Sequence, residues 1–81
     1  MQIKFSERFR RSYKEASERV RKDFNKHGRY LIENLRHPSL HAKKYDESQG
    51  IWQARVNRDW RFYFVIKDGI YHCIDIMQHP K

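Results

Sequence analysis

The chain has 81 residues, a net charge of +8 and one cysteine, Cys73, so its length predicts a single domain over residues 1–81. One cysteine excludes an internal disulfide and fits a reducing cytoplasm. No apolar run approaches the length of a membrane span and the five histidines lack ligand spacing, so we expect no membrane partner, metal or cofactor.

The first elements in chain order are predicted to be a short strand and two helices. Residues 2–5 alternate like a strand, and Ser6 is a favourable N-cap for the helix that follows. A capping-box pattern, S-x-x-E, begins at Ser12 and divides the helical region. We therefore expect a short helix at about 6–12 and a long one at about 14–35.

The longer helix is predicted to be amphipathic. Gly28 lies in its middle, where the helix could kink or split, and His37-Pro38 is expected to end it. Residues 39–50 form a polar connection with little periodicity. Residues that recur at intervals of three and four form the apolar stripe: Ala16, Val20, Phe24, His27, Leu31 and Leu35.

Three consecutive strands are predicted between residues 51 and 79, joined by two hairpins. The first hairpin has a three-residue loop over 57–59, which pairs Arg55 with Arg61 and Ala54 with Phe62.

The second hairpin contains Asp68-Gly69, which is typical of a two-residue type I′ turn. That turn would place Asp75 opposite Phe62 in the apolar layer. We prefer a three-residue loop, or a bulge, because burying an unpaired carboxylate costs several kcal/mol. This register places Phe62 opposite Ile76, and Phe64 opposite Ile74.

These strands give one apolar face and one basic face. Trp52, Ala54, Val56, Phe62, Phe64, Ile74 and Ile76 fall on the apolar face. Arg55, Arg61 and His79 share the other face, which suits a phosphodiester substrate because guanidinium binds phosphate with two donors and imidazole titrates near neutrality. The element order β-α-α-β-β-β predicts an α+β domain, with two N-terminal helices packed on a mostly antiparallel four-stranded sheet.

The sequence resembles the RelE/ParE superfamily of type II toxin–antitoxin toxins over nearly its whole length. The resemblance rests on Phe5 to Phe9 at the entry to the first helix, on Arg36 to Leu40, on the central segment Ile51 to Phe64, and on the terminal segment Asp75 to His79. It implies a RelE-like fold and, in the RelE/YafQ-like branch, a ribosome-dependent mRNA endoribonuclease that inhibits translation.

The resemblance also implies roles for individual residues. Arg61 matches a strand arginine that contacts the scissile phosphate in the family. Arg55 matches a position where some relatives have a catalytic basic residue or histidine. In the YafQ-like branch, Asp59-Trp60 matches an Asp-Trp pair, and His79 matches a terminal catalytic histidine. The implied partners are mRNA, the ribosome and a cognate antitoxin, which we expect to be acidic and partly disordered.

Metal-independent RNA cleavage needs a base for the 2′-OH, an acid for the leaving oxygen and cations for the phosphorane. Arg55 and Arg61 suit the cationic role and His79 the acid, whereas Asp59 or a lysine could be the base. Residues expected to contact RNA are Lys43, Lys44, Arg58, Trp60 and Tyr63.

Other interpretations stay open from sequence. Arg61 could simply pair with Asp75 across the sheet, Trp60 could belong to the core, and Asp59 could serve only the turn. The chain could also be a ParE-like non-catalytic inhibitor of DNA gyrase, or a basic RNA-binding module without catalysis.

Overall fold

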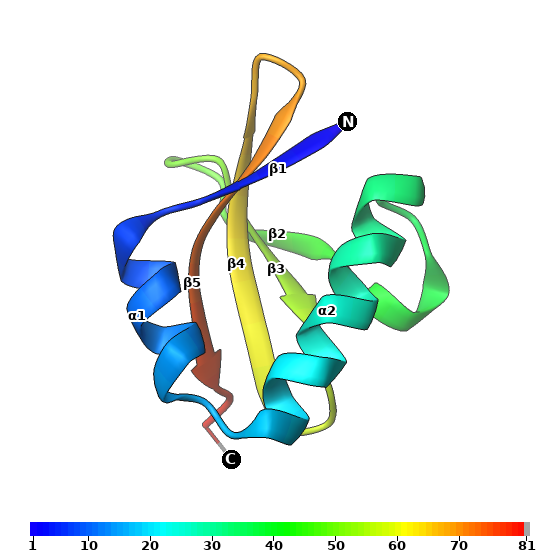
Figure 1. The fold of residues 1–81 in the computed structure, drawn as a ribbon. Coiled ribbons are helices and arrows are strands. Elements are labelled where there is room, and N and C mark those ends of the chain that lie inside the picture. The colour runs from blue at the N-terminus through cyan, green and yellow to red at the C-terminus, as the bar shows by residue number, and fades with distance from the viewer. Residues whose placement is uncertain (81) are drawn as a thin grey trace.

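A five-stranded sheet, in the order β1-β5-β4-β3-β2, lies at the centre of this computed structural model, which describes residues 1–80 (Figure 1). Only β1 and β5 pair in parallel, and the other three pairings are antiparallel. The α+β class and the two N-terminal helices agree with expectation, but the sheet has five strands where four were expected. The elements are β1 Gln2–Phe5, α1 Glu7–Glu15, α2 Glu18–Glu33, the 3₁₀ helix η1 Pro38–Leu40, β2 Lys43–Asp46, β3 Ile51–Arg55, β4 Trp60–Lys67 and β5 Ile70–Gln78.

The unexpected strand is β2, which lies within the connection that was expected to be irregular. It pairs with β3 at the edge of the sheet, and three of its four residues are exposed. An edge strand exposed in this way needs no apolar alternation, because backbone hydrogen bonds hold it in place. Its sequence, Lys-Lys-Tyr-Asp, therefore carries no strand periodicity.

The two helices begin at serine caps. The Ser6 hydroxyl accepts from the Phe9 N–H at 3.0 Å, as expected, and the Ser17 hydroxyl accepts from the Val20 N–H at 3.2 Å. The expected division at Ser12 is wrong, because the break between the helices comes at Ala16-Ser17. Ser12 instead donates from its hydroxyl to Asp75 Oδ1 at 2.8 Å, so its side chain attaches α1 to β5.

Helix α2 is shorter than expected and runs without a break. It ends at Glu33, with Asn34 as its C-cap, and Pro38 begins η1 instead of ending the helix directly. Gly28 lies buried inside the helix beside the ring of Phe24, and the helix continues through it, so the possible split is absent. No helix within residues 1–80 has both the length and the apolar character that a membrane span needs.

The register of the β3–β4 hairpin is the expected one. Arg55 pairs with Arg61, and Ala54 pairs with Phe62. Because side chains alternate across a strand, this register places the arginine pair on one face and the alanine–phenylalanine pair on the other.

The β4–β5 hairpin combines both features that were treated as alternatives. Asp68 and Gly69 have φ angles of 54° and 71° and form a two-residue turn, so Lys67 pairs with Ile70. A bulge farther along then changes the register and sets Phe62 opposite Ile76, as expected.

The bulge also corrects one detail of the expected apolar face. Phe64 faces Cys73 and not Ile74, so Cys73 is fully buried whereas Ile74 lies beside Tyr45, Tyr63 and Asp75. The extra residue thus keeps Asp75 off the core face, which was the physical reason for expecting a bulge.

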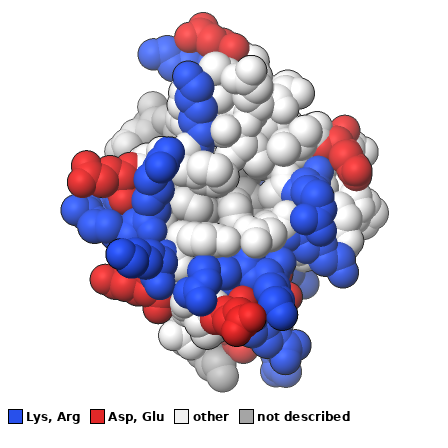
Figure 2. Space-filling view, in the orientation of Figure 1, with Lys and Arg blue, Asp and Glu red and all other residues white. Residues whose placement is uncertain are grey.

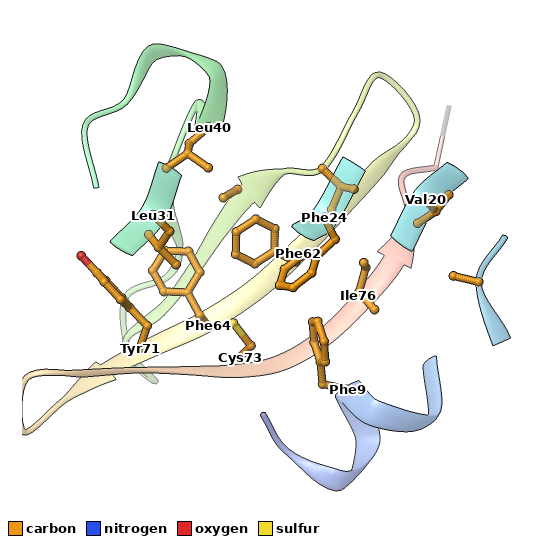
Figure 3. Close-up of a cluster of buried hydrophobic side chains, with 13 residues drawn as sticks. Phe9, Val20, Phe24, Leu31, Leu40, Phe62, Phe64, Tyr71, Cys73 and Ile76 are labelled. Carbon is orange, nitrogen blue, oxygen red and sulfur yellow. The ribbon is translucent and has the colours of Figure 1, made fainter. Parts of the chain in front are cut away.

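The hydrophobic core lies between α2 and the inner face of β4 and β5, with α1 alongside β5 (Figures 1 and 3). Phe24 of α2 meets the ring of Phe62 edge to face, with ring centroids 5.0 Å apart, and Phe9 of α1 meets the same Phe24 ring at 5.0 Å. Fully buried side chains are Phe62, Phe64, Leu31, Leu40, Ile76, Val56 and Cys73.

Helix α2 is also hydrogen-bonded to the β3–β4 hairpin. His27 Nδ1 lies 2.6 Å from the carbonyl oxygen of Arg55, so this ring nitrogen is the donor. Burial is the main influence on His27 and lowers the pKa of its imidazole below the ordinary 6.5, which favours the neutral ring.

We predict that the Cys73 thiol is inert in the folded protein. It has no exposed surface, and burial raises its pKa to about 12, so almost no thiolate forms at neutral pH. A disulfide-exchange reagent added at about pH 8 should react with Cys73 only as fast as the chain unfolds, and rapidly in urea. Rapid reaction without denaturant would show that the β5 core is open.

We predict that His27 makes stability depend on pH. Because its pKa is lower in the folded state than 6.5, the unfolded chain binds more protons, and stability falls as pH drops through 6.5 toward the folded-state pKa. Urea unfolding at about pH 7.5 and at about pH 5.5 should show a larger loss for the wild type than for His27→Asn. Asparagine places a donor near the Nδ1 position without titrating. Equal pH dependence in the two proteins would contradict the assignment.

Candidate functional site

A basic cavity of about 380 Å³ lies on the sheet face opposite the core. The strand registers build it, because Arg55 alternates with buried Ala54 on β3 and Arg61 alternates with buried Phe62 on β4. Its lining residues are His41, Ala42, Lys43, Gln53, Arg55, Arg61 and His79. Three of the four residues expected to be catalytic therefore meet here, together with one of the two lysines that were candidate bases.

The central feature of the cavity is a pair of guanidinium groups without a carboxylate partner. Arg55 and Arg61 are directly opposite each other across β3 and β4. The three ion pairs within residues 1–80 use Asp75, Asp23 and Glu18 with other cations. Like charges in this position destabilise a sheet, so the pair forms a site that attracts an anion.

The two arginines differ in how they are held. Arg61 Nη1 donates to the carbonyl oxygens of Asn57, Arg58 and Trp60 at 2.8, 3.2 and 2.9 Å. Burial, followed by repulsion from Arg55, lowers the pKa of Arg61, whereas Tyr63 and Asp59 act in the opposite direction. Arg55 Nε is buried without a hydrogen-bond partner within residues 1–80. An unsatisfied buried donor of this kind is costly unless a ligand completes it.

Two histidines border the arginine pair. His79 follows directly after β5, and its backbone N–H donates to the Asp59 carbonyl at 2.6 Å, which holds the terminal segment against the hairpin turn. His41 was not identified as a site residue from sequence. It follows η1 with a left-handed backbone, φ 46°, which is uncommon for a residue with a side chain, although histidine is among those enriched there.

Asp59 does not line the basic cavity, although it was expected to be catalytic. Together with Arg58 and Trp60 it lines a second hollow of about 460 Å³ beside the start of α2. The Asp59 N–H is bonded to Asn57 Oδ1 at 2.9 Å, as expected of a turn residue, and Trp60 packs against the core cluster.

The two lysines of β2 are on opposite faces of the sheet. Lys43 pairs with Gln53 and lines the basic cavity, whereas Lys44 pairs with Trp52 on the core face. The Lys44 ammonium lies 5.2 Å from the centroid of the Trp52 ring, an arrangement typical of a cation–π contact. Alternation along the strand therefore leaves only Lys43 beside the arginines.

The aromatic surface next to the cavity differs from the expected one. Tyr63 is only 6% exposed, and its hydroxyl accepts from Gln53 Nε2 at 3.1 Å. Tyr45 packs against its edge and is 60% exposed. Tyr45 is therefore the ring on this face with accessible surface for stacking, and it was missed because β2 was not recognised.

Asp75 does not neutralise the arginine pair, so that alternative is wrong. Its carboxylate binds the Arg8 guanidinium at 3.1 Å and the Ser12 hydroxyl at 2.8 Å, both from α1. The Asp75 carboxylate is thus committed to attaching α1 to β5. No cluster of three or more His, Cys, Asp or Glu side chains within residues 1–80 is placed to bind a metal ion.

Solved structures with the same architecture include toxins of toxin–antitoxin systems, although no family model and no curated protein matches the sequence significantly. YafQ from Escherichia coli strain BL21(DE3) has a TM-score of 0.79 and 22% identity, over 96% of this chain and 92% of that one. The YoeB/ParE toxin from Agrobacterium tumefaciens has a TM-score of 0.81 and 14% identity, over 99% and 100%.

A third structure is YoeB from Staphylococcus aureus, in its heterotetrameric YoeB–YefM toxin–antitoxin complex. It has a TM-score of 0.78 and 18% identity, over 99% of this chain and 98% of that one. Each match covers almost the whole of both chains, so the likeness extends to the complete architecture. The chain therefore has the RelE/ParE toxin fold that its central sequence motif predicts.

Proposed function

We propose that this chain is the toxin of a type II toxin–antitoxin system and cleaves mRNA on the ribosome, in the cytoplasm. The observation that carries the proposal is the Arg55–Arg61 pair, which has no carboxylate partner within residues 1–80 and shares a cavity with His41 and His79. A phosphodiester supplies the negative charge that this pair lacks, and the neighbouring imidazoles supply groups that can accept and donate a proton.

The reaction proceeds by attack of the ribose 2′-OH on the adjacent phosphorus. His41 or Lys43 takes the 2′-OH proton, and His79 gives a proton to the departing 5′-oxygen. Arg55 and Arg61 stabilise the additional negative charge of the phosphorane. The products are a 2′,3′-cyclic phosphate and a 5′-hydroxyl end, so atoms and protons balance. Asp59 and Lys44 are not needed as bases, since neither lines the cavity.

Residues around the cavity extend the proposed RNA path in two directions. Tyr45 offers an exposed ring next to Tyr63, and stacking on such a ring contributes about 1–3 kcal/mol per base. Beyond the hairpin turn, Arg58 and Trp60 line the second hollow. A strand whose scissile phosphate lies between the arginines can place neighbouring nucleotides on either side.

The face of the molecule that carries α1 and α2 has features that suit the binding of an antitoxin. Figure 2 shows uncharged atoms at its centre with Lys and Arg side chains on both sides. An apolar hollow of about 290 Å³ lies there, lined by Phe5, Phe9, Arg10, Tyr13, Phe24 and Asn25. We propose that an acidic, partly disordered antitoxin inserts apolar side chains into this hollow and pairs with the surrounding cations.

We predict that Arg55→Met removes cleavage without lowering stability. The change keeps the aliphatic stem but removes one transition-state cation, so cleavage of ribosome-bound mRNA should fall by about 10²–10³. The melting temperature should stay the same or rise, because repulsion with Arg61 is relieved. Lys67→Met, which removes an equal charge at the far end of β4, is the matched control.

Primer extension on translated mRNA and thermal melting measure both effects. Unchanged cleavage by Arg55→Met would remove the arginine pair from the mechanism. If the wild-type protein leaves mRNA intact while DNA breaks accumulate in cells, the gyrase-inhibitor alternative replaces the nuclease.

We predict that association with the antitoxin depends on salt in two distinct ways. Charge attraction should make the association rate constant fall steeply as ionic strength rises, because steering is screened. Burial of the Phe5 side chain is not screened, so Phe5→Ala should speed dissociation at all salt concentrations. Stopped-flow mixing with the product of the neighbouring gene measures both rates. A salt-independent association rate would contradict the face that carries α1 and α2, with the cations around its apolar hollow, as the docking surface.

A further inference from the structure

Helix α2 contacts the β3–β4 hairpin through two side chains that are one helical turn apart. His27 Nδ1 donates to the Arg55 carbonyl at 2.6 Å, and Asp23 Oδ2 accepts from Asn57 Nδ2 at 2.9 Å. The four-residue spacing places Asp23 and His27 on the same face of the helix. The helix therefore holds the hairpin at two positions, the last residue of β3, Arg55, and the first residue of the turn, Asn57.

Asn57 connects this contact to the shape of the turn. Its side-chain oxygen accepts from the N–H groups of Asp59 and Trp60 at 2.9 and 3.0 Å. Its amide nitrogen is the group bound by Asp23. Both ends of one amide are thus committed, one to the three-residue turn and the other to α2, which fixes its orientation.

The hairpin turn also holds the guanidinium of Arg61. One nitrogen, Nη1, donates to three carbonyl oxygens of this short segment, those of Asn57, Arg58 and Trp60. No other nitrogen of Arg61 has a hydrogen-bond partner within residues 1–80. The bonded nitrogen therefore acts as an anchor, and the rest of the fork is left for the anion.

We propose that Asp23 and Asn57 are positioning residues that aim the Arg61 guanidinium into the basic cavity. Neither lines the cavity, so both act through the turn. This inference rests on the proposed function only in taking the anion to be the phosphate of RNA. A turn that loses its link to α2 still forms, but its carbonyl groups no longer hold Nη1 in one place.

The most informative comparison is Asp23→Ala with Asp23→Asn. Both remove the same charge, but asparagine keeps an oxygen that can accept from Asn57 Nδ2, whereas alanine does not. Asn57→Asp is a second, independent variant. It keeps the oxygen that caps the turn and replaces the donor with a carboxylate oxygen that faces Asp23.

The first readout needs no catalysis. In NMR spectra the Nε–H signal of Arg61 should be sharp and dispersed in the wild type and in Asp23→Asn, and should move to the position of a mobile arginine in Asp23→Ala and Asn57→Asp. Titration with inorganic phosphate, followed on this signal, should give an affinity about tenfold weaker in the latter two, as for the loss of one hydrogen bond. Asp23→Asn should stay within about twofold of the wild type.

The second readout is kinetic and separates this inference from the proposed function. On ribosome-bound mRNA, Asp23→Ala should lower kcat with little change in KM, because it misplaces a cation that acts in the transition state. Absence of cleavage by the wild type would overturn the nuclease, while the phosphate titration would still decide the positioning role. Identical Arg61 signals and phosphate affinities in Asp23→Ala, Asn57→Asp and the wild type would overturn the positioning role.

Discussion

The arginine pair across β3 and β4 is the constraint on which the site depends. Placing Arg55 opposite Arg61 brings two permanent charges together, and the strands gain nothing from that contact. The register that produces it is fixed from the other face, where Ala54 and Phe62 are buried and Phe62 packs against Phe24 of α2. A shift by one residue would expose Phe62 and bury an arginine, at a cost far above that of the repulsion.

The two faces of the sheet therefore have different roles. The inner face supplies stability through aromatic and aliphatic packing, and the outer face collects the charges that this packing leaves there. Two nearby carboxylates do not relieve the charge of the outer face, because Asp75 binds α1 and Asp23 is engaged with Asn57 and Arg19. The result is a small domain in which folding itself places two guanidinium groups together without a carboxylate partner within residues 1–80.

Much of this arrangement could be predicted from the sequence, because period-two alternation is strong where one face is buried. That alternation predicts the β3–β4 register and places Arg55 and Arg61 together. Alternation fails to predict β2, because the exposed residues of this strand do not alternate. Tyr45, which lies on β2, was therefore not identified as an exposed aromatic residue of the site. Ser12 was misread because a capping-box pattern does not distinguish a cap from a serine that bonds to a distant strand.

The residues around the arginine pair were harder to predict than the pair itself. The position of Asp59 depends on the geometry of the turn, and Asp59 does not line the basic cavity. His41 does line it, but its left-handed backbone is not indicated by any periodicity in the sequence. Long-range placement decides such residues, and local patterns carry little information about it.

The central claim is that the arginine pair binds the scissile phosphate of RNA. The most direct test is a crystal structure of this protein with a short RNA in which one ribose lacks its 2′-OH and cannot react. The account predicts that the phosphate following that ribose contacts both Arg55 and Arg61, with His79 beside the 5′-oxygen. A phosphate bound instead to the basic residues of α2, with the cavity between β3 and β4 empty, would contradict it.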